Sequence, residues 1–267
     1  RLLLNHYKIF LSHDSLLTDA IKGSIGSALG GTYYYLGYHN PKTKELLERS
    51  LVHLNKDHNK NIVQIASTLA NLGAIYRSLG NEKKAITLLE QSIAIYKKQQ
   101  TNSIGAAKAI AYLGNIYRIL GNCTKAADLL EQSLIIYKKH KENHVGAARA
   151  MAYLGVIYRD TGDFQKAKDL LEQSLIIAEK HPEHTNRAFS MTYLGNIHRE
   201  LGNYGKAKDL LEQSSAIYKK YLFKDNINIG WSLSHLAIVY NELGDYQQAQ
   251  SVLEQSLVIY KKHYNQE

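Results

Sequence analysis

The sequence of 267 residues contains very little cysteine and very little proline. It has one cysteine, Cys123, and two prolines. A single thiol excludes an intrachain disulfide framework and favours a reducing compartment. Proline is the residue that most often interrupts a helix, so its scarcity is compatible with a helical chain. The abundant Leu, Ala, Lys, Glu and Gln also favour helices.

Long apolar runs are missing as well. No stretch of about 18 apolar residues occurs, so we predict no membrane span. We find no signal-peptide pattern at the N-terminus. We therefore expect a cytoplasmic protein, or one delivered into a host cytoplasm if it is a bacterial effector. The chain begins with Arg1 rather than Met, and we expect it to be a piece of a longer protein.

The sequence motifs of common enzymes are absent. There is no GxxxxGK[ST] phosphate loop, no GxGxxG after a strand, no GxSxG and no HExxH. His140 and His144 are spaced i, i+4, but no third metal ligand lies near them in the sequence. Cys123 has no activating base that we can name, so we expect a packing residue. We predict no catalytic residue, no metal and no cofactor.

Negative charge is the smaller share of the charged residues. The 33 Lys and Arg against 24 Asp and Glu give a formal net charge of +9 and a pI near 9.3. Such a surplus favours acidic partners, which include anionic protein segments, nucleic acids and anionic membrane surfaces. Net charge alone does not choose among them.

What the chain has is a repeat. Residues 109–140 read AIAYLGNIYRILGNCTKAADLLEQSLIIYKKH, and similar marks return along the sequence. The turn glycines are 43, 41, 41, 40 and 42 residues apart. They are Gly37, Gly80, Gly121, Gly162, Gly202 and Gly244. A period in this range indicates a stacked array of helix pairs.

We divide the chain into a leading segment and six repeats. The repeats are predicted at about 24–57, 62–98, 104–140, 146–180, 185–220 and 228–262. Residues 1–22 are either the second half of a truncated preceding repeat or an N-terminal capping helix. Because no polar-faced helix follows the last repeat, we expect Leu253, Leu257 and Tyr260 to be exposed. That face could support end-to-end self-association.

One side of each first helix is predicted to face away from the core. At 100° per residue, Ile110, Leu113 and Tyr117 share one stripe, whereas Asn115 and Arg118 lie on the opposite side. In stacked two-helix arrays the first helices line the inner, concave wall. The opposite side should therefore face a groove.

Read along the array, this side carries a row of arginines, one per repeat. They are Arg77, Arg118, Arg159 and Arg199, and Asn241 takes the same position in the last repeat. The neighbouring positions add asparagines, further basic residues and tyrosines. These are Asn115, Asn196, Lys108, Arg149, Tyr112, Tyr153 and Tyr193. Guanidinium groups grip carboxylates, asparagine can pair with a peptide backbone, and tyrosine offers rigid contact area.

The arginine row has a simpler interpretation too. Asp160, Glu200 and Glu242 occupy the next position in three repeats, so the arginines could pair with them. They could also only solvate the helix face. Under the first interpretation the groove binds an acidic segment of a partner protein. Under the others the row has no ligand.

The repeat resembles the tetratricopeptide repeat. In the fourth repeat the marks are Met151, Leu154-Gly155, Tyr158, Gly162, Ala167 and Ser174. The usual repeat has 34 residues, and this one is similar to the longer variety of about 40–42. That variety occurs in Pins-type spindle-orientation adaptors, kinesin light chains and bacterial signalling proteins. The proline common at the end of the family's repeat is absent, and His198 stands in place of the tyrosine in repeat 5.

The resemblance implies an all-α, right-handed superhelical solenoid of stacked antiparallel helix pairs. It also implies protein–protein binding in the concave groove. We therefore predict a non-enzymatic scaffold that binds a protein or peptide segment, which the charge suggests is acidic. One alternative is a sensor or autoinhibitory arm of a larger nucleotide-switched signalling ATPase. A weaker alternative is nucleic-acid binding through the basic groove.

Overall fold

The computed structural model describes residues 18–35, 41–140, 145–180, 185–222, 224 and 226–264. Within these residues it contains twelve α-helices and no strand. Residues 1–17 of the leading segment, the turn at Gly37 and His144 lie outside the described residues. The chain divides into two compact units, residues 1–141 and 142–267, and each is described by itself.

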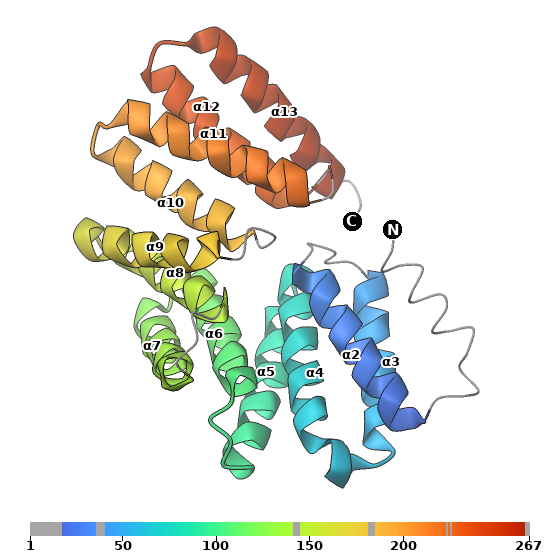
Figure 1. The fold of residues 1–267 in the computed structure, drawn as a ribbon. Helices are drawn as coiled ribbons and strands as arrows, with labels where there is room; N and C mark the ends of the chain where they lie inside the picture. The colour runs from blue at the N-terminus through green and yellow to red at the C-terminus, as the bar shows by residue number, and fades with distance from the viewer. Residues whose placement is uncertain are drawn as a thin grey trace. The chain divides into compact units, whose positions relative to one another are not determined.

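The first unit contains three pairs of helices, and the two helices of each pair pack side by side in opposite directions (Figure 1). The first helices begin at Asp19 and His58, ahead of the predicted starts at residues 24 and 62. In chain order the pairs are α2 (Asp19–Tyr35) with α3 (Pro41–Asn55), α4 (His58–Ser78) with α5 (Glu82–Lys98), and α6 (Ile104–Ile119) with α7 (Cys123–Lys139).

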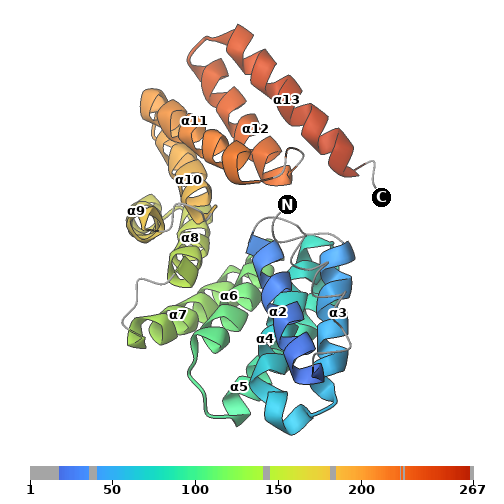
Figure 2. The same ribbon diagram turned by 45° about the vertical axis from the view of Figure 1, so that its right-hand side comes forward.

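The second unit has the same construction, and Figure 2 shows its pairs from another side. They are α8 (Val145–Asp160) with α9 (Phe164–Glu179), α10 (Asn186–Glu200) with α11 (Tyr204–Tyr221), and α12 (Ile227–Glu242) with α13 (Tyr246–Tyr264). In both units the structure confirms an all-α fold of stacked antiparallel helix pairs.

Each described turn contains a glycine that is followed by an asparagine or an aspartate. Gly80, Gly121, Gly162, Gly202 and Gly244 have φ between +74° and +86°, where a side chain would be strained. This residue caps the second helix in four of the five described turns. The side chains of Asn81, Asn122, Asp163 and Asp245 each accept a hydrogen bond from the backbone amide three residues later. Asn203 makes no such side-chain bond.

The two helices of a pair approach each other closely at a glycine of the first helix. A Cβ added at Gly114 would lie 3.0 Å from Leu130 Cγ and 3.2 Å from the Ala126 carbonyl oxygen. Similar contacts surround Gly73, Gly155 and Gly195. The absence of a side chain at these glycines therefore allows the two helices of a pair to pack closely.

A buried serine also fastens each pair. Ser133 Oγ donates a 2.7 Å hydrogen bond to the Ala107 carbonyl oxygen, from the second helix to the first. The equivalent bond, at the same length, is made by Ser92, Ser174, Ser214 and Ser256. The hydroxyl group at this position therefore links the two helices of the pair.

First helices lie on the inner side of each unit. Within the first unit α4 packs on both α2 and α6, and within the second α10 packs on α8 and α12. Consecutive second helices do not pack on one another to the same extent. Neighbouring first helices are therefore closer together, which makes their shared face the concave one.

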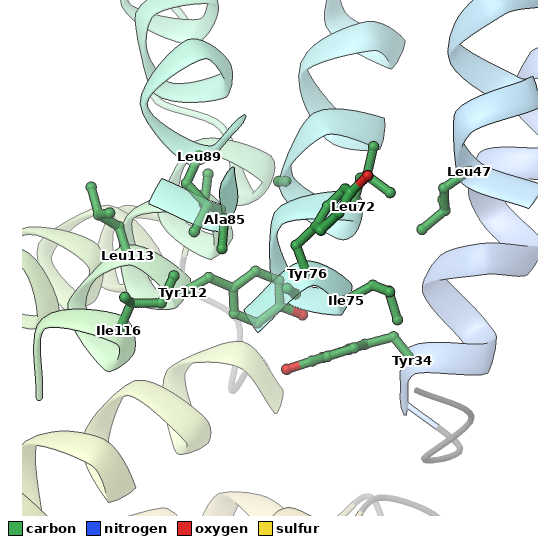
Figure 3. Packing of buried hydrophobic residues seen from close by; sticks show 13 residues of the cluster. Tyr34, Leu47, Leu72, Ile75, Tyr76, Ala85, Leu89, Tyr112, Leu113 and Ile116 are labelled. Atoms are coloured by element: carbon green, nitrogen blue, oxygen red, sulfur yellow. The ribbon is translucent and has the colours of Figure 1, made fainter. Parts of the chain in front are cut away.

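The core of the first unit lies between its helix pairs. Figure 3 shows side chains of one cluster, in which Leu72 and Ile75 from α4 and Leu113 and Ile116 from α6 contribute to the same interior. Tyr34 and Tyr112 meet edge to face, with ring centroids 5.4 Å apart. This packing fixes the orientation of the first helices, and so of the wall that they form.

The last helix, α13, has an exposed apolar face. Leu253 is 52% exposed, whereas Leu130, Leu171 and Leu211 at the same repeat position are fully buried. Leu257 is 49% exposed and Tyr260 is half-buried. The expected exposure of the two leucines is confirmed. Self-association through them stays a prediction.

Candidate functional site

The candidate site in the first unit lies on the wall formed by α2, α4 and α6. Lys108 is half-buried, and its ammonium group donates a 2.8 Å hydrogen bond to Asn71 Oδ1. The same ammonium lies 5.6 Å from the centre of the Tyr112 ring. Tyr112 itself is buried at 4% exposure, so it supports this wall more than it offers free contact area.

Two arginines of the row belong to this unit, and both are half-buried. Arg77 Nη2 donates to Ser78 Oγ at 3.2 Å. Arg118 bonds to Asn115 Oδ1 through Nε at 3.1 Å and through Nη2 at 3.0 Å. The structure thus brings two predicted site residues, Asn115 and Arg118, into direct contact. The amide oxygen holds the guanidinium in place without neutralising its charge.

In the second unit the same wall is aromatic. The Phe189 ring lies 5.5 Å from Tyr153 and 4.7 Å from Tyr193. Trp231 continues the row, 4.9 Å from Tyr193 and edge-on to His235 at 5.1 Å. These residues come from α8, α10 and α12, so the aromatic row crosses all three first helices of the unit.

Arg159 and Arg199 of this unit each contact an acidic neighbour, and Arg159 also contacts an aromatic ring. Arg159 lies over the Tyr193 ring at 4.8 Å, and its Nε donates to Asp160 at 2.9 Å. Arg199 reaches Glu200 at 3.4 Å. The side chains of Arg159 and Arg199 are 20% and 27% exposed. Pairing with the next residue, the simpler interpretation of the sequence, is therefore present at these two positions.

Asn196 differs from its counterpart in repeat 3. It is 2% exposed, and neither of its side-chain amide atoms has a hydrogen-bond partner within the described residues. Arg199 stands three residues later, as Arg118 does after Asn115, but it turns to Glu200 instead. A buried amide without hydrogen-bond partners lowers the free energy of unfolding, so Asn196 destabilises the second unit.

His235 is a buried histidine close to the positive charges of this region. Burial first, and then the charges of Arg159 and Arg199, lower the pKa of His235 to about 4. Its imidazole is therefore neutral near pH 7. The site in this unit consequently owes its positive charge to arginine.

The remaining predicted residues are placed as follows. Arg149 Nε donates to Asn186 Oδ1 at 2.9 Å, and Asn241 is exposed in the last turn of α12. The sequence did not point to Ser24 and Ser67, which lie at the repeat position of Lys108 and line a hollow in the first unit. Aligning the repeats at that position would have shown the small side chains.

Neither metal-binding clusters nor spanning helices occur in the described part of the chain. No three His, Cys, Asp or Glu side chains among those residues could hold a metal ion. His140, one of the two spaced histidines, contacts the Asn102 carbonyl oxygen at 2.6 Å. None of the described helices combines the length and apolar character that crossing a membrane requires.

Comparison with known proteins points to one family. A family model described as tetratricopeptide repeat matches residues 27–98, 106–180 and 182–262. A search of the curated proteins finds no match. Among solved structures, a Podosopora anserina putative kinesin light chain with nearly identical TPR-like repeats is 30% identical, with a TM-score of 0.52. That match covers 74% of this chain and 97% of the other.

Two further solved structures share the fold at lower identity. BtubC (BKLC) from P. vanneervenii is 17% identical, with a TM-score of 0.63, and the match covers 83% of this chain and 91% of the other. The apo form of RapI is 15% identical, with a TM-score of 0.70, covering 98% and 92%. At these identities the likeness concerns the fold alone.

Proposed function

Since this chain belongs to the tetratricopeptide repeat family, we propose that it is a non-enzymatic scaffold that binds an acidic segment of a partner protein on its wall of first helices. The fold typically serves protein–protein interaction, and members of the family are generally not enzymes. The acidic nature of the partner and the choice of surface are specific to this proposal.

The arginine row is the observation that carries it. Arg77, Arg118, Arg159 and Arg199 repeat at one position of four successive first helices. All four are half-buried. A partly buried guanidinium binds a carboxylate more strongly than one surrounded by water, because screening is weaker there. The net charge of +9 supports an acidic ligand.

The two units should differ in how readily they accept a carboxylate. The Asn115 amide that bonds to Arg118 is neutral and does not itself compete with a ligand carboxylate. Arg159 already pairs with Asp160, and a ligand must compete with that carboxylate. We therefore expect the arginines of the first unit to contribute more to binding.

The test uses a blocked, fluorescein-labelled octaglutamate peptide and the whole chain. Arg77→Gln together with Arg118→Gln should weaken binding about tenfold, which corresponds to about 1.4 kcal/mol. The matched control is Lys97→Gln with Lys138→Gln, which removes the same charge from exposed ends of α5 and α7. The control should lower affinity much less, and far-UV circular dichroism should show unchanged helicity.

Two results would overturn the proposal. Equal losses in the arginine pair and in the lysine pair would mean that only net charge matters. Binding of a single-stranded oligonucleotide of equal charge, more tightly than the peptide and with a steep salt dependence, would favour a nucleic-acid ligand instead.

A further inference from the structure

The last helix pair, α12 with α13, exposes apolar side chains that the earlier pairs cover. Some exposed apolar positions, such as Ile135 and Ile176, recur from repeat to repeat and are not special to one pair. A second group is more exposed in the last pair than at the matching positions of repeats 3 to 5. We call this group the end face, and it consists of Ile238, Tyr246, Ala249, Leu253, Leu257 and Tyr260.

The first helix of the following repeat covers the counterparts of the end face. In repeat 4 the counterparts Val156 and Leu171 belong to one buried cluster with Leu194 and Ile197 of α10. The next pair is covered in the same way by α12. The end face therefore has the chemistry of a surface against which another helix packs.

The helix α13 also lacks charge where the other second helices carry it. Its first eight residues, 246–253, contain no charged side chain, whereas the corresponding residues of α5, α7, α9 and α11 contain two or three. Gln250, for example, stands where α9 and α11 carry Lys168 and Lys208. Depletion of charge beside exposed apolar and aromatic side chains is typical of the core of a protein interface.

Most of the end face forms a single stripe along α13. Ala249, Leu253, Leu257 and Tyr260 follow one another at spacings of four, four and three residues, which places them on one side of a helix. The helix has 19 residues, so it is about 28 Å long. Two such stripes can pack lengthwise, as the helices of a coiled coil do.

We propose that the end face binds the end face of a second copy of this chain, and that the two α13 helices pack antiparallel about a two-fold axis. In a two-fold contact a residue near the axis meets its own counterpart, so a charged residue there would meet a like charge. A stripe without charge avoids this repulsion, which the net charge of +9 otherwise produces between copies.

The charges at the ends of α13 select the antiparallel direction. Lys261 and Lys262 lie in the last turns of the helix, and a parallel pair would bring these lysines of both copies together. In the antiparallel pair they lie instead near the end that begins after Asp245. Leu253 and Leu257 flank the midpoint of the helix, so Leu253 of one copy packs against Leu257 of the other.

The size of the contact sets the expected affinity. A standard interface buries about 800 Å² on each partner, and a stripe along one helix covers less than that. We therefore expect a weak dimer, with a dissociation constant on the order of 10 µM. Sedimentation velocity of the whole chain from about 1 to 200 µM should show monomer at the low concentrations and dimer at the high ones.

Substitutions on the end face test the surface. Leu253→Glu with Leu257→Glu should abolish the dimer, since it places carboxylates at the centre of the contact. The matched control is Ile135→Glu with Ile176→Glu, because these side chains are 56% and 61% exposed, against 52% and 49% for the leucines. The control should dimerise as the unchanged chain does, and a circular dichroism melt of each variant establishes that the helices are retained.

A milder variant adds charge without removing apolar surface. Gln250→Lys restores the lysine that α9 and α11 carry at this position, so the helix itself should tolerate it. The dissociation constant of the dimer should rise about tenfold, because the added lysine meets the positive charge of the second copy.

Cross-linking tests the direction of the two helices. In a Cys123→Ser background each variant carries a single thiol. Leu253→Cys mixed with Leu257→Cys should form a disulfide between the two variants, because the antiparallel register brings these positions within bonding distance. Neither variant should link to itself. Self-linking of Leu253→Cys would mean a parallel pair.

Three further results would overturn the inference. A chain that stays monomeric up to about 200 µM does not bind its own copy at the end face. Species that grow beyond the dimer would indicate a head-to-tail contact between two different faces. Equal loss of the dimer in the end-face variant and in the control would place the contact elsewhere on the chain.

Discussion

Replacing Asn196 with valine should stabilise the second unit. The two amide atoms of this side chain are buried without partners in the described part of the chain, and such a group costs about 1–3 kcal/mol. Valine fits the position, because Val156 occupies it in repeat 4 and is fully buried. Asparagine and valine have similar helix propensities, so the backbone contributes little. We expect the free energy of unfolding to rise by about 1–3 kcal/mol.

Asn115→Val is the matched control with the opposite sign. Asn115 occupies the same position in repeat 3, but its Oδ1 accepts two hydrogen bonds from Arg118, at 3.1 and 3.0 Å. The substitution removes both bonds and leaves the guanidinium in a half-buried place. A loss of about 1 kcal/mol is expected, since partial exposure weakens such bonds.

Urea unfolding can follow the second unit by itself, because Trp231 is the one tryptophan of the chain and lies in α12. Its fluorescence reports the second unit, and circular dichroism reports all helices. If Asn196→Val lowers the midpoint of the fluorescence transition, the reasoning is refuted. Such a result would mean that water or a rotated Arg199 satisfies the amide in solution.

A double-mutant cycle tests the reason why Asn196 lacks a partner. Arg199 turns to Glu200, whereas the residue after Arg118 is Ile119. Glu200→Ile should free Arg199 to bond Asn196 as Arg118 bonds Asn115. In that background Asn196→Val should no longer stabilise, which appears as a coupling energy of about 1 kcal/mol between the two sites. Additive effects would show that Glu200 does not hold Arg199 away.

Three further predictions concern packing and pH. Ser133→Ala removes the 2.7 Å bond to the Ala107 carbonyl oxygen and should lower the free energy of unfolding by about 1 kcal/mol; an unchanged urea midpoint would show that the bond contributes nothing. Gly155→Ala would place a Cβ 3.1 Å from the Ala167 carbonyl oxygen, which cannot move aside. Although alanine favours helix, the free energy of unfolding of the second unit should fall by about 1–3 kcal/mol in the fluorescence assay. A rise would contradict the packing argument. The pKa of His235 is lowered to about 4, so the folded state prefers the neutral imidazole. The free energy of unfolding should therefore be highest above about pH 6.5 and should fall as the pH drops towards 4, by about 2 kcal/mol at pH 5. His235→Phe should flatten this dependence between pH 7.5 and 5.

The fold was largely predictable from the sequence because it depends on short-range, repeated features. A glycine at each turn, an N-cap after it and a helical stripe of apolar residues define each hairpin without long-range information. The division into two units was not predicted, since the spacing of the turn glycines is nearly constant throughout. The missing cap at Asn203 also has no sequence signal, because this residue is the same type as Asn122.

The site was predictable only to the level of residue positions. Helical geometry identified the face that carries Arg118 and Arg199, but it could not say which partner each side chain takes. That choice depends on the residue that follows the arginine, which is Ile119 after Arg118 and Glu200 after Arg199. It also depends on the side-chain rotamer that each arginine adopts. The hollow escaped prediction for another reason, because it is defined by small side chains, which carry no positive signal in a single sequence.

The repeats provide an internal comparison that bears on function. The second helices of repeats 3, 4 and 5 share the segment LLEQS, and their serines make the same hydrogen bond at the same length. On the first helices, the wall position of Lys108 instead carries serine, lysine, arginine, phenylalanine or tryptophan. Packing explains why the LLEQS segment is constant, but it does not explain the variation at the Lys108 position, because the repeated backbone accommodates all of these side chains. If this wall were only a surface in contact with water, small polar residues would suffice at every repeat. A row of contacting aromatic rings beside arginines would then place apolar surface there without any function. Within each unit, this variation is what we would expect if the first helices present unlike side chains to a ligand, as proposed above.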